Sequence, residues 1–336
     1  MNNKKILLAN CLLLLALLLF VLVPSIANHL FGLNGHISGN VSLLLSGSAS
    51  VIALGGIALL YCLITKRKFK NVMVIKKMSI KQVYLTIFVA CGTYIFAIGI
   101  NSISMKLFPV AIKDSTQISN LLGSSSTLLG LLVVVLLPAF FEEIFFRGVF
   151  LDAYGGVNKK VKYFILTSIF ASFHGNVMQI IYVMFLGLVL LLVREYTGSL
   201  VGSMTLHATN NAISFIISKA LMNYMNIGLE SSASKVAQQA NVGFVAVLLQ
   251  ASIFFLIGGA ILYTNLRKLK EYKEADSRTK GIEQEESNNS LKYIVEDEKY
   301  TVINEKIRNT KVEDSTKYIP LAIYFVSMAV LLVARY

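Results

Sequence analysis

Long apolar runs, separated by short polar segments, dominate the chain. They can be traced at residues 6–23, 41–64, 83–105, 127–150, 163–174, 177–193, 199–222, 242–264 and 319–334. Most approach or exceed the roughly 20 residues that a helix needs to cross a bilayer. A segment surrounded by lipid must satisfy its backbone hydrogen bonds internally. The pattern therefore predicts an all-α, polytopic transmembrane helix bundle of about eight or nine spans.

Two of these runs need a closer interpretation. The run at 163–174 is short, and only Gly175 and Asn176 separate it from the next run. We therefore expect a short or re-entrant helix that ends near His174. The first run is followed by Ser25-Ile-Ala27, which resembles a signal-peptide cleavage site, but the run is longer than the usual apolar core of roughly 7–15 residues. We expect a retained helix there, with a cleaved signal peptide as the alternative.

Basic residues cluster in particular loops. Segment 66–81 holds seven Lys or Arg residues and three more lysines lie at 159–162, whereas segment 24–40 has none. Cytoplasmic loops of membrane proteins carry an excess of Lys and Arg. The distribution predicts an integral membrane protein, which we expect in a bacterial plasma membrane, with its N-terminus and its charged tail at 266–318 in the cytoplasm.

Composition narrows the classes of function. The 336 residues are 55% hydrophobic and carry a formal net charge of +13. Segment 266–318 has 12 acidic and 12 basic residues, so the basic excess belongs to the membrane part, where it suits contact with the lipid bilayer. We expect no nucleic-acid partner and no nucleotide, because the sequence has neither interleaved aromatic and basic residues nor a glycine-rich phosphate loop. The three cysteines lie in apolar runs and are interpreted as packing residues.

The fourth run contains charges that need a reason. Glu142, Glu143 and Arg147 interrupt an otherwise apolar stretch, and ionisable groups at bilayer depth are costly and usually functional. At about 100° per residue, Arg147 lies roughly 40° around the helix from Glu143 but roughly 140° from Glu142. Arg147 should therefore pair with Glu143. Glu142 is left to face elsewhere, and an unpaired carboxylate in such a site suits the exchange of a proton.

Two of the four histidines lie in apolar helices that follow these glutamates. His174 ends the sequence Phe170-Ala-Ser-Phe-His, and His207 stands four residues before Asn211, so each pair shares one helix face. His29 and His36 fall in the first external loop and are interpreted as solvated residues. A single histidine in a membrane is often only a hydrogen-bonding residue between helices. Two of them, together with Glu142, favour a catalytic cavity.

The three patterns occur in order on successive helices: Glu142-Glu143-x-x-x-Arg147, then Phe170-x-x-x-His174, then His207-x-x-x-Asn211. In this combination the chain resembles the CPBP family of intramembrane endopeptidases, which includes the type II CAAX prenyl endopeptidases and was formerly called Abi. No motif residue is substituted. The resemblance covers a protease-like core at 81–265. Outside it lie two helices and a basic loop at 1–80, the charged tail or linker at 266–318 and a last transmembrane helix at 319–336.

The resemblance also implies roles for the motif residues. Glu142 would be the general base for a water molecule, His174 its partner, and His207 with Asn211 the donors to the oxyanion. Glu143, Arg147 and Phe170 would support them. We therefore expect a glutamate-type peptidase without a cofactor. A zinc metallopeptidase, with Glu142, His174 and His207 as ligands, is the alternative; the absence of a His-Glu-x-x-His motif and the use of Asn weigh against it.

The substrate class stays open at this point. The resemblance allows a prenylated CAAX-like C-terminus, a peptide pheromone or bacteriocin leader, or a membrane protein. A catalytically silent membrane scaffold or bacteriocin-immunity protein of the same fold is the alternative function, and loss of a motif residue would have favoured it. A proton-coupled transporter is a third interpretation, disfavoured because no internal repeat is visible.

The charged tail carries two local expectations. Segment 283–290 is rich in Glu, Asn and Ser and predicts a flexible linker. Segment 293–303 contains two short β-prone stretches that predict a small hairpin, which alone would be only marginally stable.

Overall fold

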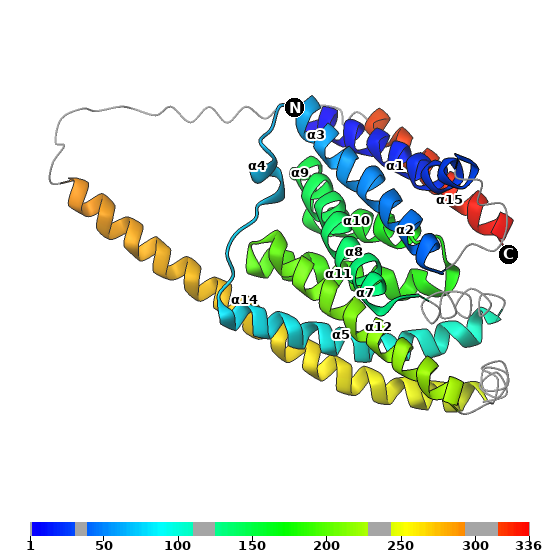
Figure 1. The fold of residues 1–336 in the computed structure, drawn as a ribbon. Coiled ribbons are helices and arrows are strands. Elements are labelled where there is room, and N and C mark those ends of the chain that lie inside the picture. The colour runs from blue at the N-terminus through cyan, green and yellow to red at the C-terminus, as the bar shows by residue number, and fades with distance from the viewer. Residues whose placement is uncertain (1, 31–38, 110–124, 228–242, 293–314, 336) are drawn as a thin grey trace.

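The computed structural model describes residues 2–30, 39–109, 125–227, 243–292 and 315–335 of the chain. This described part is a bundle of helices and contains no strand (Figure 1). The predicted all-α architecture is therefore confirmed. The hairpin expected at 293–303, and His36, lie outside the described residues.

Several membrane-length helices are interrupted by π-helical segments, in which the hydrogen bonds run to the fifth residue along. The first half of the chain forms α1 (Asn2–Leu30), α2 (Gly39–Ser50), η1 (Val51–Gly56), α3 (Ile57–Thr65), α4 (Phe69–Met73) and α5 (Ile80–Leu107). The fourth apolar run forms α7 (Thr127–Gly130), η3 (Leu131–Leu136), α8 (Leu137–Glu142), η4 (Glu143–Val149) and α9 (Phe150–Ala153). The remainder forms α10 (Lys159–Phe173), α11 (Val177–Thr197), α12 (Leu200–Ile227), α14 (Phe244–Lys292), η5 (Ser315–Tyr318) and α15 (Ile319–Arg335). Segments η1, η3 and η4 are π-helical, and η5 is a short 3₁₀ helix.

Seven helices in the described part are long and apolar enough to cross a membrane. Two further helices account for the remaining apolar runs. Helix α10 has 15 residues, about 22 Å in length, which is shorter than the roughly 30 Å hydrocarbon core. Helix α12 has 28 residues but carries the polar side chains of the His207 region. Large apolar side chains such as Leu63, Leu128 and Val333 are more than 70% exposed, as expected for surfaces that face lipid.

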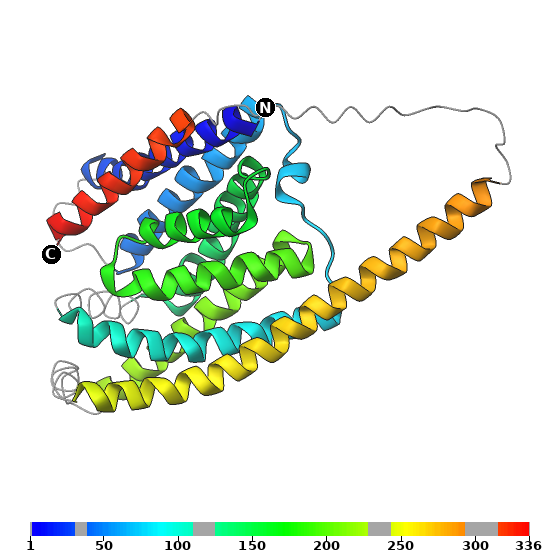
Figure 2. The same ribbon diagram turned by 180° about the vertical axis from the view of Figure 1, so that it is seen from behind.

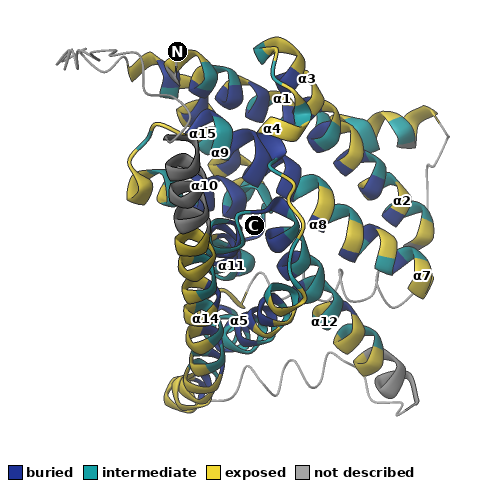
Figure 3. Cartoon of the chain, turned by 90° about the vertical axis from the view of Figure 1, so that its left-hand side faces the viewer, coloured by how far each residue is buried: buried dark blue, intermediate teal, exposed yellow. Residues whose placement is uncertain are grey.

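The helices are arranged around a buried centre. Helices α1 and α15 lie side by side along one edge of the bundle, and α5 and α14 lie along the opposite edge (Figures 1 and 2). Residues of α9, α10 and α11 are buried between them, while much of α14 is exposed (Figure 3). The α5–α14 contact depends on glycine, because a Cβ on Gly258 would come within 2.4 Å of the Phe96 backbone nitrogen.

Two helices extend beyond their expected ends. Helix α1 continues through Pro24 to Leu30, where the sequence predicted a loop. Membrane helices tolerate an internal proline because neighbouring groups can satisfy the freed backbone carbonyl. Helix α14 continues to Lys292, so the flexible linker expected at 283–290 is wrong. Elongation of an existing helix needs no new nucleus, and the pairs Arg267–Glu271 and Lys270–Glu274 support the polar part of the helix.

Polar contacts attach the terminal helices to the centre. Asp152 of α9 pairs with Lys5 and Arg67 and accepts a hydrogen bond of 2.7 Å from the Tyr61 hydroxyl. Asn10 of α1 links the Tyr154 hydroxyl to the backbone of η5. On α15, the Tyr324 hydroxyl donates to the carbonyl of Ile169 at 3.2 Å. The last turn of α10, which precedes His174, is thereby fixed from outside the motif-bearing helices.

Candidate active site

Glu143 and Arg147 form the buried ion pair that their spacing predicted. Both side chains lie in η4 and are at most 2% exposed, and Arg147 Nη1 stands 3.0 Å from Glu143 Oε1. The other guanidinium nitrogen, Nη2, donates to the carbonyl of Gly187 on α11 at 3.2 Å. A buried charge needs both a counter-charge and hydrogen bonds to remain ionised. Arg147 has both.

Phe170 lies directly behind the two histidines. Its fully buried ring is stacked by the Arg147 guanidinium at 4.0 Å and contacts the ring edges of His174 and His207 at centroid distances of 4.9 and 6.0 Å. Cations are attracted to the faces of aromatic rings. The phenylalanine therefore joins the ion pair on η4 to both imidazoles, which explains an apolar residue among polar motif positions.

His207 is oriented by Glu143, a contact that the spacing argument did not predict. Its Nδ1 lies 2.9 Å from Glu143 Oε1, and its side chain is 3% exposed. Because an ionised carboxylate only accepts hydrogen bonds, Nδ1 carries a hydrogen. Nε2 then faces Glu142, whose Oε2 is 3.9 Å away. The Glu143 carboxylate therefore pairs with the charge of Arg147 and also fixes the orientation of the His207 ring.

His174 stands at the C-terminal end of α10, where a turn leads into α11. Gly175 adopts a positive φ of 57°, and the Asn176 side chain caps α11 by accepting from the backbone of Gln179. Nδ1 of His174 lies 2.9 Å from the carbonyl oxygen of Phe170. A carbonyl can only accept, so Nδ1 is the donor and the neutral ring presents a lone pair at Nε2. That nitrogen suits a role as acceptor from water.

The two adjacent asparagines of α12 serve different neighbours. Asn211 Nδ2 donates to the carbonyl of Val134 in η3 at 3.2 Å. Asn210 is fully buried, and its Nδ2 donates to the Tyr182 hydroxyl of α11 at 2.7 Å. The pair therefore ties α12 to the helices on both sides of it.

One cavity of about 310 Å³ brings the four predicted catalytic residues together. Its lining comprises Val134, Pro138, Glu142, His174, Gln179, Tyr182, Val183, Leu186, His207, Asn211, Ser214 and Phe215. Glu143, Arg147 and Phe170 are absent from this lining and lie behind it. Glu142 is 17% exposed where Glu143 is fully buried, and its Oε2 makes no hydrogen bond within the described residues. Of the two adjacent carboxylates, Glu142 alone faces the cavity.

Three polar lining residues escaped the motif analysis, namely Gln179, Tyr182 and Ser214. Gln179 and Tyr182 are three residues apart and therefore share one face of α11. Because the rest of α11 is mostly apolar, this spacing did not stand out in the sequence as a polar motif. Ser214 lies seven residues after His207, two helical turns along the same face. Helical spacing from the known histidines would have found Ser214, but not the residues of α11.

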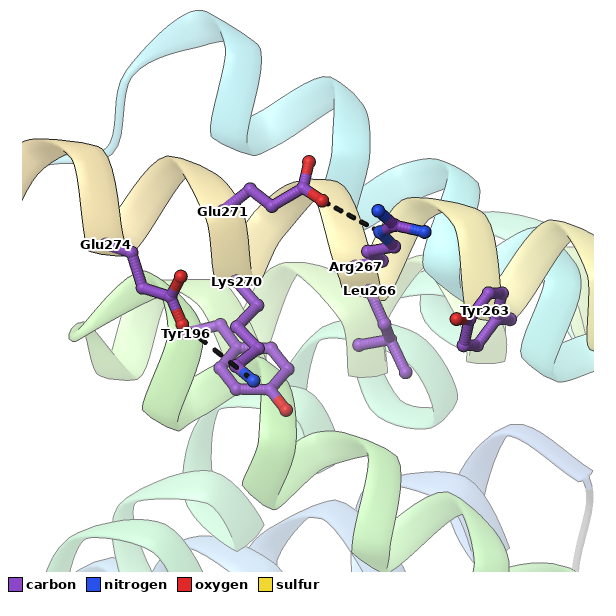
Figure 4. A pocket seen from close by; sticks show the side chains of 7 residues that line it. All are labelled: Tyr196, Tyr263, Leu266, Arg267, Lys270, Glu271 and Glu274. Atoms are coloured by element: carbon purple, nitrogen blue, oxygen red, sulfur yellow. Dashed lines mark hydrogen bonds and ion pairs between the residues drawn. The ribbon is translucent and has the colours of Figure 1, made fainter.

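A larger cavity of about 460 Å³ lies elsewhere, between α14 and the end of α11 (Figure 4). Its charged residues are Arg267, Glu271, Lys270 and Glu274, which pair with one another along α14. None of the predicted catalytic residues lines it. Size alone does not identify an active site, and the smaller cavity is the candidate because residues of all three motifs line it.

The zinc alternative involves Glu142, His174 and His207 as ligands. Within the described ranges, no three His, Cys, Asp or Glu side chains are close enough to hold one metal ion. Nε2 of His207 and Oε2 of Glu142 are 3.9 Å apart, a separation that two ligands lying about 2.0–2.2 Å from one zinc ion can have. We derive no reaction step through a metal.

Comparison with known proteins supports the same region. The family model described as type II CAAX prenyl endopeptidase, Rce1-like, matches residues 124–213. This match spans all three motifs and ends two residues after Asn211. The comparisons with curated proteins and with solved structures gave no match.

The ion pair generates a prediction about stability. Replacement of Arg147 by Met leaves Glu143 without its cation, and we expect this to cost about 3–5 kcal/mol, the usual penalty for breaking a buried pair. The double variant Glu143→Gln with Arg147→Met should lose less than the sum of the two single variants, because it leaves no unpaired charge. Thermal unfolding in detergent micelles measures this. Arg267→Met, in the exposed pair with Glu271, is the matched control and should unfold like the wild type; additive losses at 143 and 147 would contradict the coupling.

Proposed function

We propose that this chain hydrolyses a peptide bond inside the membrane, and the match of residues 124–213 to the model of the Rce1-like type II CAAX prenyl endopeptidases supports this proposal. The substrate is a membrane-associated protein or peptide. The convergence of Glu142, His174, His207 and Asn211 on one cavity carries this proposal. A silent scaffold would not need these four polar side chains on a common surface.

In the proposed mechanism, Glu142 and His174 activate a water molecule. The Glu142 carboxylate takes a proton from water, and the Nε2 lone pair of His174 accepts a hydrogen bond from the other hydrogen. The resulting hydroxide attacks the scissile carbonyl carbon. Breakdown of the tetrahedral intermediate breaks the C–N bond, and the proton held by Glu142 passes to the leaving amine. One carboxyl and one amine terminus are formed.

His207 and Asn211 stabilise the negative charge that develops on the carbonyl oxygen. Preorganised donors in a water-poor cavity are worth more than the same donors in bulk water. The Glu143 carboxylate holds the His207 ring through Nδ1 at 2.9 Å, and the ring donates into the cavity when Nε2 carries a hydrogen. We propose that the Arg147–Glu143 pair serves this site by fixing the charge beside His207.

Replacement of the motif residues tests the proposal. We expect Glu142→Gln, His174→Ala and His207→Ala each to lower the cleavage rate by at least about 10²-fold, the usual contribution of a general acid–base group. The assay uses fluorogenic peptides in detergent micelles: a farnesylated peptide with a CAAX-like end, a leader peptide and a transmembrane peptide. Glu195→Gln, which removes an acid that contacts Lys159 and Tyr163, and His29→Ala are the matched controls. Wild-type cleavage rates in all three motif variants would contradict the enzyme hypothesis and favour the catalytically silent membrane scaffold.

Metal dependence is tested separately. We propose metal-independent catalysis, so incubation of active protein with 1,10-phenanthroline or EDTA should leave the rate unchanged. An inhibited rate that returns on addition of zinc would instead assign a metallopeptidase. The support for this proposal is the absence of a His-Glu-x-x-His motif and the presence of Asn211 among the motif residues.

Orientation in the membrane is also a proposal. Lys5, Arg67 and Asp152 meet at one end of the bundle, and we place this end and the charged part of α14 in the cytoplasm. In a background without Cys11, Cys62 and Cys91, Lys68→Cys and Ser277→Cys should react with an impermeant maleimide only after permeabilisation of cells. His29→Cys should react in intact cells. The reverse labelling pattern would invert the topology.

A further inference from the structure

The motif residues alone supply few free donors for the oxyanion. Asn211 has two amide hydrogens, and one is committed to the carbonyl of Val134 at 3.2 Å. The Nδ1 hydrogen of His207 is committed to Glu143 at 2.9 Å, so this ring donates into the cavity only when Nε2 is also protonated. Hydrolysis of a peptide bond develops a full negative charge on one oxygen, and acyl-transfer sites usually offer it two or more donors. A further donor in the cavity would complete the set.

Tyr182 has the required position. It lines the same cavity as Glu142, His174, His207 and Asn211, and it comes from α11, a helix that contributes none of the three motifs. Its side chain is partly buried and forms part of the cavity lining. A phenolic hydroxyl is both a donor and an acceptor.

Asn210 sets the direction in which this hydroxyl donates. Its side-chain nitrogen, on a fully buried residue, donates to the Tyr182 oxygen at 2.7 Å. The oxygen of Tyr182 is thus occupied as an acceptor, and its own hydrogen makes no other hydrogen bond within the described part of the chain. That hydrogen is available to a group bound in the cavity.

The burial of Asn210 has a cost that a simple helix clamp does not explain. Its side-chain oxygen is buried and has no hydrogen-bond partner among the described residues. An unsatisfied buried acceptor lowers stability, and an apolar pair at 182 and 210 would join α11 and α12 without it. Retention of both polar groups beside the catalytic side chains favours a role in chemistry.

We propose that Tyr182 is a further catalytic residue, whose hydroxyl donates a hydrogen bond to the oxyanion, and that Asn210 is the positioning residue that orients it. The proposal rests on the proposed peptidase function and adds a donor from a fourth helix segment. No bond is formed or broken at Tyr182. Its hydrogen bond strengthens as the carbonyl oxygen becomes negative, so it lowers the barrier and not the substrate affinity.

Kinetics of Tyr182→Phe test the assignment. We expect kcat to fall by about 10- to 100-fold with KM within about twofold of the wild type, because the lost donor acts mainly in the transition state. The substrate is the fluorogenic peptide of the panel that shows the highest Glu142-dependent rate. Tyr196→Phe, a change of the same kind on the same helix but at the other cavity, should keep the wild-type kcat.

A double-variant cycle separates catalysis from packing. Asn210→Ala should lower kcat by less than Tyr182→Phe, and the double variant should be no slower than Tyr182→Phe, because Asn210 acts through the hydroxyl. A role in packing alone would lower the unfolding temperature and leave kcat unchanged in both variants; this result overturns the proposal. The proposal is also overturned if kcat of the double variant falls by the product of the two single-variant losses.

Different results would contradict the role of Tyr182 and the proposed peptidase function. Wild-type kcat in Tyr182→Phe, with a slow Glu142→Gln variant, removes only the role of Tyr182. Wild-type cleavage in Glu142→Gln removes the proposed function, and the assignment of Tyr182 falls with it.

Discussion

A fully buried carboxylate, Glu143, is the constraint on which the site depends. Its Oε1 contacts Arg147 at 3.0 Å and His207 at 2.9 Å, so one oxygen joins η4 to α12. Arg147 extends the connection to α11 through the Gly187 carbonyl and to α10 through the Phe170 ring. In a low-dielectric interior an unpaired charge is expensive, and a complete pair resists separation. Glu143 and Arg147 together therefore connect four helix segments, namely η4, α12, α11 and α10.

This constraint explains why two adjacent glutamates have different tasks. Glu143 pairs with Arg147 and orients His207 behind the cavity, whereas Glu142 lines the cavity itself. Both histidines have their Nδ1 atoms engaged, His174 by a carbonyl and His207 by a carboxylate. The two rings therefore differ in the acceptor that fixes their orientation, a neutral carbonyl for His174 and the Glu143 carboxylate for His207.

The sequence predicted much of this site and less of its surroundings. The apolar runs predicted the helical class. Angular spacing within one helix predicted that Arg147 pairs with Glu143 and that Glu142 faces a different direction. The contact of Glu143 with His207 and the approach of Tyr182 to Asn210 join different helices, so their spacing in the chain carries no signal. The continuation of α14 to Lys292 was missed because composition alone suggested a linker, while the helix already formed in the apolar part lowers the cost of extension.

The origin of the oxygen in the new carboxyl group tests the central claim most directly. With enzyme in excess over a fluorogenic peptide, a single turnover in H₂¹⁸O can be analysed by mass spectrometry of the N-terminal product. If Glu142 activates water in this cavity, the first turnover places one ¹⁸O atom in that carboxyl group. An unlabelled product from the first turnover would show that the oxygen came from the protein, and would contradict the account.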